Sequence, residues 1–243
     1  MNAVKLTYRF DLPDSRSRVF ELELDRDTAL LTTPSIDAPP AWTELAFNQC
    51  VGCPLDPAKV AHCPAALHLA KVIDGFSDLV SYDQVRVTVQ TEERSVAATL
   101  SAQQGLASLM GLMMASSGCP RTAVFRPMAR FHLPFSNEAE TAYRVAAMYL
   151  VAQHFVARDG GDADLELKNL ESVYRGVHAV NRGMAQRIRV ASRQDAIVNA
   201  IVLLDVYSSL VPAAIHDILA EIKPAFAALL SETSTANLAV AKV

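Results

Sequence analysis

The chain has 243 residues, of which 51% are hydrophobic and 20% are charged, so it is long enough to bury a sizeable core in one large or two smaller domains. Only nine residues are glycine, and this composition excludes a disordered or fibrous chain. The formal net charge is −4, whereas general nucleic-acid-binding proteins carry a basic excess, so nucleic acid is not expected as a partner.

The first residues, "MNAVKLTYRFDLPDS", contain no apolar segment of the kind that a secretion signal has. We therefore expect a cytoplasmic protein. Thiols stay reduced in that compartment, so its four cysteines are expected to be metal ligands or inert thiols and not disulfides.

Four short segments alternate apolar and polar residues with the period of two that is typical of strands with one buried face. Residues 4–12 and 18–25 flank the turn-forming stretch "PDSRS", and residues 84–90 and 96–100 flank the polar stretch "TEER". The pattern predicts two antiparallel β-hairpins that together form a small four-stranded sheet.

Helical periodicity begins after the first hairpin, with helices predicted at 64–80 and 103–116. Asn137, followed three residues later by Glu140, resembles a capping box and indicates the start of a third helix. Pro212 and Pro224 each suit the first turn of a further helix. The C-terminal half is thus predicted to be helical, with helices at 137–158, 164–191, 194–210, 212–222 and 224–231, and residues 232–243 are predicted to be a loose tail.

The segment from Ser95 to Pro120 carries no charged residue and is long enough to cross a bilayer. It nevertheless contains Gln103, Gln104 and several serines, and its first part alternates like a strand. We interpret it as a buried strand followed by a buried helix, and we expect no membrane contact.

These elements predict an α+β fold, in which two antiparallel hairpins form a small sheet and a helical bundle makes up the C-terminal half. The linker "DGGDAD" divides a sheet-plus-helix domain at 1–158, which contains the cysteines, from a helical domain at 159–243, unless the two form one continuous domain. The very apolar helices at 103–116 and 196–210 predict a homodimer.

The cysteines have a distinctive arrangement. Cys50 and Cys53 form a C-x-x-C pair, Cys63 follows after nine residues and Cys119 after another 55, and no cysteine is left over. Four thiolates complete the coordination of a tetrahedral zinc ion or a [4Fe–4S] cluster. Cys53, Cys63 and Cys119 are each followed by proline, as is the last cysteine of the bacterial ferredoxin motif.

A [4Fe–4S] cluster is the interpretation that we favour, because zinc sites usually consist of two close cysteine pairs and this chain has one pair and two single cysteines. The alternatives are a structural zinc ion, with His62 or His68 replacing one cysteine, a redox dithiol of Cys50 and Cys53, and inert thiols. Two motifs of cluster enzymes are absent: the ferredoxin spacing C-x-x-C-x-x-C, and the C-x-x-x-C-x-x-C of radical chemistry on S-adenosylmethionine.

The sequence does not favour an enzyme. It has no glycine-rich phosphate loop, no G-x-S-x-G motif and no dinucleotide-binding fingerprint. Four cysteine ligands would also leave no open position on a cluster for a substrate. We therefore expect no catalytic residue, and predict a redox or gas sensor or an electron carrier that acts through a protein partner. The alternative is a binding or scaffold protein whose metal is structural.

Lys168, Arg175, Arg182 and Arg189 are spaced seven residues apart, so they would form one basic stripe along the predicted helix at 164–191. Such a stripe could bind an acidic partner protein. The other interpretation is an ordinary solvated face of an amphipathic helix.

Overall fold

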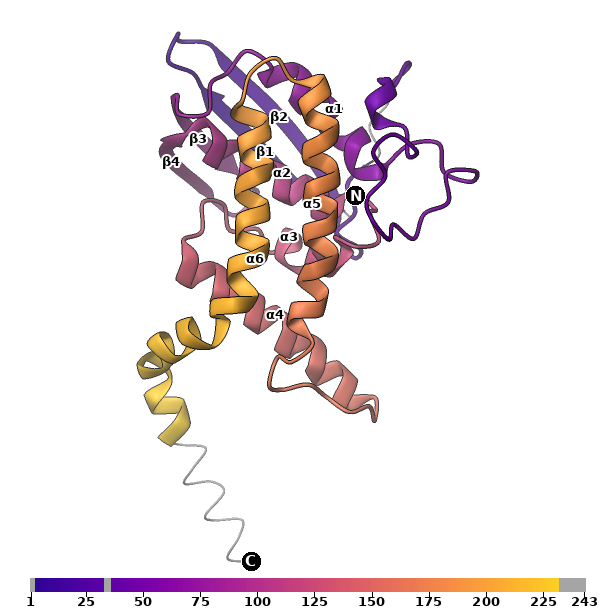
Figure 1. Ribbon diagram of the computed structural model, residues 1–243. Helices are drawn as coiled ribbons and strands as arrows, with labels where there is room; N and C mark the ends of the chain where they lie inside the picture. The colour runs from indigo at the N-terminus through magenta and orange to yellow at the C-terminus, as the bar shows by residue number, and fades with distance from the viewer. Residues whose placement is uncertain (1–2, 33–35, 232–243) are drawn as a thin grey trace, which may run out of the picture. The chain divides into compact units, whose positions relative to one another are not determined.

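The computed structural model describes residues 3–32 and 36–231 (Figure 1). It contains a four-stranded sheet with the order β2-β1-β3-β4, in which every pair of neighbours is antiparallel. The strands are β1 (Ala3–Asp11), β2 (Ser17–Asp25), β3 (Gln84–Gln90) and β4 (Ser95–Ser101). The two predicted hairpins and the α+β class are confirmed, whereas the tail predicted at 232–243 lies outside the described residues.

Alternation along the strands produces one buried face of the sheet. On β1, Val4, Leu6, Tyr8 and Phe10 are buried, while Lys5 and the other residues between them are at least partly accessible. Tyr8 is paired with Phe20 of β2 and with Val89 of β3, so the apolar side chains of three strands share this face. The sheet therefore has a hydrophobic side that must be covered.

Two helices cover that face (Figure 1). Phe76, the last residue of α1 (Pro64–Phe76), packs against Phe10 with a distance of 4.8 Å between ring centroids. Helix α2 (Ala102–Ser116) follows β4 directly, and Gly105 lets it approach closely, since a Cβ there would lie 2.9 Å from Val87. The uncharged segment thus forms a strand followed by a helix, as predicted. The helix α2 is buried, whereas the prediction of a buried strand is wrong, because β4 lies at the edge of the sheet and its residues are exposed or half-buried.

The described chain divides into two compact units. The first consists of the described residues up to Ser136 together with 169–209. Besides the sheet, α1 and α2, it contains η1 (Ala41–Thr43), η2 (Ala123–Phe125), α3 (Arg126–Arg130), α5 (Leu170–Ala191) and the first half of α6 (Ala196–Ile222). Phe125 of η2 packs on Tyr174 of α5, with ring centroids 5.4 Å apart. These elements place α5 beside the segment that follows α2.

The second unit consists of residues 137–168 and the described residues from Leu210. Helix α4 (Glu138–Arg158) begins with the predicted capping box, in which Asn137 and Glu140 each accept a hydrogen bond from the other's backbone N–H. Tyr149 donates a hydrogen bond to Asp164 at 2.8 Å. The domains predicted at 1–158 and 159–243, or one continuous domain, stay a prediction.

Two predicted helix boundaries are wrong. Helix α5 begins at Leu170 and not at 164, because Asp164 is held in a turn by Tyr149, by Gln153 and by the backbone N–H of Lys168. The predicted helices at 194–210 and 212–222 are one helix, α6, with Pro212 in its interior. Proline weakens a helix by removing one hydrogen bond, but it does not have to end it.

Helix α6 continues through η3 (Lys223–Phe226) into the short helical segment predicted at 224–231. Within the described residues, the stretch Ala196–Ser231 is long and apolar enough to cross a membrane by length and composition alone. A single helix of this kind is weak support for a membrane span, since core helices of soluble proteins meet the same criterion.

Candidate metal centre

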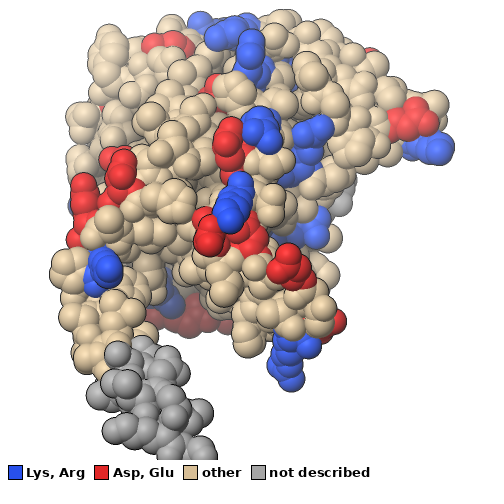
Figure 2. All heavy atoms as spheres, turned by 60° about the horizontal axis from the view of Figure 1, so that its bottom comes forward, with Lys and Arg blue, Asp and Glu red and all other residues tan. Residues whose placement is uncertain are grey.

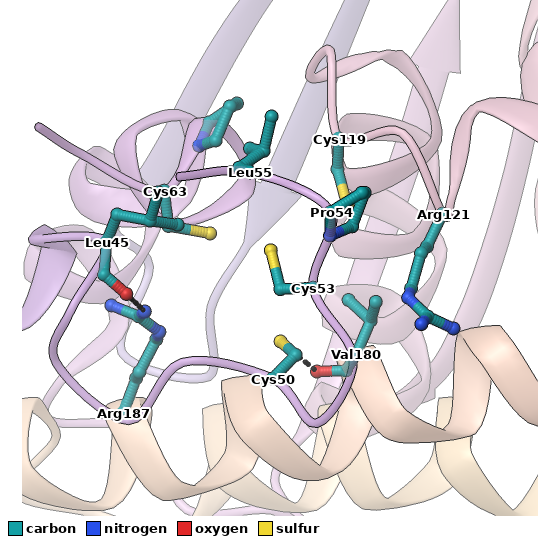
Figure 3. Close-up of a pocket in the computed structure, with 11 residues that line it drawn as sticks. Leu45, Cys50, Cys53, Pro54, Leu55, Cys63, Cys119, Arg121, Val180 and Arg187 are labelled. Carbon is teal, nitrogen blue, oxygen red and sulfur yellow. Dashed lines mark hydrogen bonds between the residues drawn. The ribbon is translucent and has the colours of Figure 1, made fainter. Parts of the chain in front are cut away.

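All four cysteines line one cavity in the first compact unit. Figure 3 shows their sulfur atoms pointing into the space between the side chains. Cys63 and Cys119 are buried, and Cys50 and Cys53 are half-buried. The structure therefore brings together, from three separate segments, the residues that the sequence predicts as metal ligands.

The C-x-x-C pair forms a tight turn. The backbone N–H of Cys53 donates to the carbonyl of Cys50 at 3.0 Å, and Gly52 has a φ of +67°. Glycine suits this position because other residues are strained in the left-handed region. The turn directs both thiols of the pair into the same cavity (Figure 3).

Cys63 is fixed at the start of α1, where it is the residue before the helix and Pro64 occupies the first turn. Its backbone N–H donates to the carbonyl of Thr43 in η1 at 2.8 Å, and its carbonyl accepts from Leu67 at 3.0 Å. Proline suits the first helical turn, since no backbone N–H is required there. This third thiol thus stands on a rigid helix terminus.

Cys119 follows the end of α2, in a loop tied back to that helix. Ser117 and Thr122 both donate side-chain hydrogen bonds to the carbonyl of Met114, at 2.8 Å and 2.6 Å. The backbone N–H of Cys119 in turn donates to the Ser117 hydroxyl at 3.2 Å, and Gly118 has a φ of +90°. These bonds satisfy a carbonyl at the helix terminus and fix the fourth thiol.

Helix α5 forms a wall of the cavity. Val180 and Arg187 line it, and Gly183 lies against Cys50. A Cβ at position 183 would stand 2.7 Å from the Cys50 sulfur and 3.4 Å from its Cα, so only glycine allows this approach. The sulfur of Cys50 also lies 4.0 Å from the Val180 carbonyl, a weak S–H···O contact.

Arg187 is only 1% exposed. Its Nη1 donates to the carbonyls of Trp42 and Glu44, both at 2.7 Å, and its Nη2 donates to that of Leu45 at 3.0 Å. Its Nε is buried and has no hydrogen-bond partner. No sequence motif predicts a role for this residue, which ties α5 to the segment preceding the C-x-x-C turn and also lines the cavity.

Arg121 lines the cavity from a third direction (Figure 3). Its Nε donates to the Gly52 carbonyl at 3.0 Å, and its Nη2 bonds the same oxygen. A Cβ on Gly176 of α5 would lie 3.0 Å from its Nη1, so glycine leaves room for the guanidinium there. Arg121, also missed from the sequence, connects the loop after Cys119 to the C-x-x-C turn.

Two of the thiols resist ionisation. Burial raises the pKa of Cys50 to about 11, the nearby Cys63 and Cys119 act in the same direction, and Arg187 partly opposes them. Burial also raises the pKa of the Cys63 thiol, again opposed in part by Arg187. A bound metal would favour the ionised forms of these thiols, because thiolates and not thiols are its ligands.

In this structure the four cysteine side chains do not yet form the coordination sphere of a metal. Within the described residues, no three His, Cys, Asp or Glu side chains are close enough to share one metal ion. The residues fit such a group by their chemistry and by the cradle that Gly183 leaves open for Cys50. Binding would require the cysteine sulfurs to come closer together than they are in this structure.

The two histidines considered as substitute ligands do not line the cavity. The Nδ1 of His62 lies 2.9 Å from the Thr43 hydroxyl, within hydrogen-bonding distance. His68 is buried in α1, and this burial lowers its pKa to about 4. The structure thus gives neither histidine a place beside the four sulfurs.

The predicted basic stripe is shorter than expected. Arg175, Arg182 and Arg189 are exposed on α5, whereas Lys168 precedes the helix, belongs to the second unit and pairs with Glu166. Arg175 pairs with Glu171 at 2.9 Å, while Arg182 and Arg189 have no ion pair within the described part of the chain. Acidic and basic side chains are interspersed on the face drawn in Figure 2, as on an ordinary solvated surface.

Comparison with known proteins identifies a family whose function is unknown. The sequence profile of a domain of unknown function, DUF6901, matches residues 6–227. No curated protein and no solved structure gives a significant match.

Proposed function

The chain belongs to the DUF6901 family, a domain of unknown function, and we propose from its cysteine cavity that it binds an iron–sulfur cluster of the [4Fe–4S] type. The proposed ligands are Cys50, Cys53, Cys63 and Cys119. The observation that carries the proposal is that every cysteine of the chain faces one cavity, although the four come from three separate segments.

The cavity lining favours a cluster over zinc. Leu45, Leu55 and Val180 surround the sulfurs with apolar groups, and such groups control how far water reaches a cluster. Pro54 and Pro64 also line the cavity and stiffen the chain directly after two of the ligands. The spacing of one close pair and two single cysteines is also unlike the paired knuckles of structural zinc sites.

A bound cluster would supply one-electron chemistry, and with four protein thiolates it would leave no iron open to a substrate. We therefore propose an electron carrier, or a redox or gas sensor, that acts through another protein. The partner that we favour is an acidic protein, which would meet the exposed arginines Arg175, Arg182 and Arg189 on the outer face of α5. Arg182 directly precedes Gly183, which contacts Cys50, so this surface adjoins the wall of the cavity.

A structural zinc ion is the second candidate. The tight Cys50–Cys53 turn, with its Gly52 at positive φ, suits a zinc ion as well as a cluster. In that case the metal would link the turn to α1 and to the loop after α2, and the protein would act as a scaffold.

Metal analysis of anaerobically purified protein distinguishes the two candidates. The cluster predicts brown protein with about four iron and about four sulfide per chain. Colourless protein with about one zinc ion per chain would support the scaffold instead. Protein that stays free of both metals after reconstitution under reducing conditions would exclude both proposals.

Cys119→Ser tests the most distant ligand. Metal binding is coupled to folding at such sites, so this variant should lose metal and solubility together. Ser117→Ala is the matched control, because it lies in the same loop and removes the two hydrogen bonds of its hydroxyl but no thiol. Full metal content in a folded Cys119→Ser variant would remove Cys119 from the ligand set.

A further inference from the structure

The geometry points to Arg187 as a positioning residue for the metal centre. We propose that its buried positive charge balances a negatively charged metal–thiolate group and makes that group easier to reduce. This inference rests on the proposed function, since it requires a cluster in the cysteine cavity. It goes further by assigning a residue that sets the reduction potential.

The burial of Arg187 requires an explanation. The side chain is 1% exposed, and arginine cannot give up its proton in a protein as a buried lysine or histidine can. A charge moved out of water is destabilising by several kcal/mol unless it is paired. Within the described residues, no carboxylate forms an ion pair with Arg187.

The three carbonyls that Arg187 binds satisfy only its terminal nitrogens. They are neutral dipoles, so they do not balance a full positive charge. Its buried Nε–H has no partner at all, and the residue lines the cavity that the four sulfurs face. The Phe47 ring lies 6.0 Å from the guanidinium carbon, but no carboxylate of the described residues balances the charge. A cation without an anionic partner and an unused donor thus stand beside four groups that become anions when they bind metal.

The charge of the proposed group matches this environment. Four thiolates around an oxidised [4Fe–4S] core form a dianion, and one-electron reduction makes it a trianion. A nearby positive charge stabilises the trianion more than the dianion, and therefore raises the reduction potential. Arg187 lines the same cavity as the four cysteines, so its charge lies beside the place that such a group would occupy.

Arg121 lines the same cavity but differs in its bonding. Its Nε and Nη2 both donate to the Gly52 carbonyl, and it is partly accessible to solvent, which screens its charge. It therefore provides an internal comparison, in which a second guanidinium lines the cavity without being deeply buried.

The first experiment measures the reduction potential of the reconstituted protein, with dithionite supplying the electron. Arg187→Gln removes the charge, and its midpoint potential should shift to a more negative value. Arg187→Lys keeps a positive charge and should restore most of the wild-type value. Arg189→Gln removes an exposed arginine two residues along the same helix and should leave the potential unchanged.

A second experiment needs no change at position 187, in case those variants fail to fold. Wild-type protein is labelled with the heavy nitrogen isotope in arginine only and is reduced. Pulsed electron paramagnetic resonance should then detect coupling between the unpaired electron and an arginine nitrogen. The Arg121→Lys variant, labelled in the same way, should retain this coupling, because Arg187 and not Arg121 is its source.

The outcomes are distinct. Wild-type protein that binds no iron–sulfur cluster ends the proposed function and this inference together. A cluster-containing protein in which Arg187→Gln keeps the wild-type potential overturns the inference alone, as does loss of the nitrogen coupling in Arg121→Lys. A more negative potential in Arg187→Gln, recovered in Arg187→Lys, supports it.

Discussion

The two faces of α5 place the same type of residue in opposite environments. Arg175, Arg182 and Arg189 lie on the outer face and are exposed, whereas Arg187, two residues before Arg189, is buried beside the cysteines. The outer arginines keep their hydration, and Arg175 also pairs with Glu171. Arg187 has instead exchanged water for three backbone carbonyls.

The difference arises from the neighbours along each face. Gly176, Val180, Gly183 and Arg187 are spaced by four, three and four residues, so they share one side of the helix. The two glycines let the chain segments of Arg121 and Cys50 approach this side. Arg187 therefore extends from a helix face that other segments cover, and its burial follows from those segments and not from its own polarity.

The largest expected effect compares Arg187→Met with Arg189→Met. The first change leaves the carbonyls of Trp42, Glu44 and Leu45 without their donors, and we expect a loss of stability on the order of 2–4 kcal/mol, even though a buried charge is also removed. The second change should alter stability by less than about 0.5 kcal/mol. Urea unfolding measures both.

Equal stability of Arg187→Met and Arg189→Met would contradict the proposed difference between the buried and the exposed face of α5. It would mean that the segment at 42–45 is held without Arg187, and that the guanidinium is not needed for folding.

The sequence pattern predicts the sheet well because its information is local. Alternation at 84–90 yields β3 with the bounds that the structure has, and Asn137 with Glu140 begins α4 as a capping box should. The four cysteines could be grouped because their residue type and spacing carry chemical meaning. Arg187 could not be found in this way, since a single arginine in a helix indicates a solvated position unless the covering segments are known.

Some signal for Arg187 nevertheless exists. The regular spacing of Gly176, Val180, Gly183 and Arg187 marks a helix face on which a backbone or ligand approaches closely. The seven-residue spacing of the other arginines predicts a basic stripe on the opposite face of the helix and gives no information on Arg187. The wrong start of α5 has a similar cause, because the contacts of Asp164 with Tyr149 and Gln153 are tertiary and leave no periodic pattern.

His68 of α1 sharpens the comparison, because it is a buried basic side chain that can lose its charge. It is 7% exposed, and burial lowers its pKa from the usual 6.5 to about 4. The neutral ring therefore stabilises the fold above about pH 6.5, and this contribution is lost as the pH falls through 4. The loss should be on the order of 2–3 kcal/mol.

Unfolding measured between neutral pH and pH 4 tests this expectation. His68→Leu removes the titrating group and should make stability less sensitive to acid over that range. His154→Gln changes an exposed histidine and serves as the control. If His68→Leu and the wild type lose stability in parallel, other groups cause the acid sensitivity.

Gly183→Ala also tests the inner face of α5, with a smaller expected effect on stability than Arg187→Met. Alanine in place of glycine should stabilise a helix interior by roughly 0.5–1 kcal/mol. At this position, however, the new Cβ would lie 2.7 Å from the Cys50 sulfur, so we expect lower metal content after reconstitution. Gly176→Ala meets only the flexible end of Arg121, at 3.0 Å, and should keep its metal. Equal metal content in both variants would show that Cys50 does not need this close approach.

The smallest effect on stability is expected on the outer face. Replacing Arg175, Arg182 and Arg189 together by alanine should change the melting temperature little, since each exposed charge contributes within about 0.5 kcal/mol. The rate of electron transfer to an acidic carrier such as a plant-type ferredoxin should fall, and its dependence on salt should weaken, because screened charges guide the encounter. Lys168→Ala, outside α5, is the control.

A drop of about ten degrees in the melting temperature of the triple variant, on the order of 2–4 kcal/mol for a chain of this size, would instead show that the arginines hold the fold together. An unchanged transfer rate in a stable triple variant would end the docking proposal and leave α5 with one functional face, the one that Arg187 shares with the cysteines.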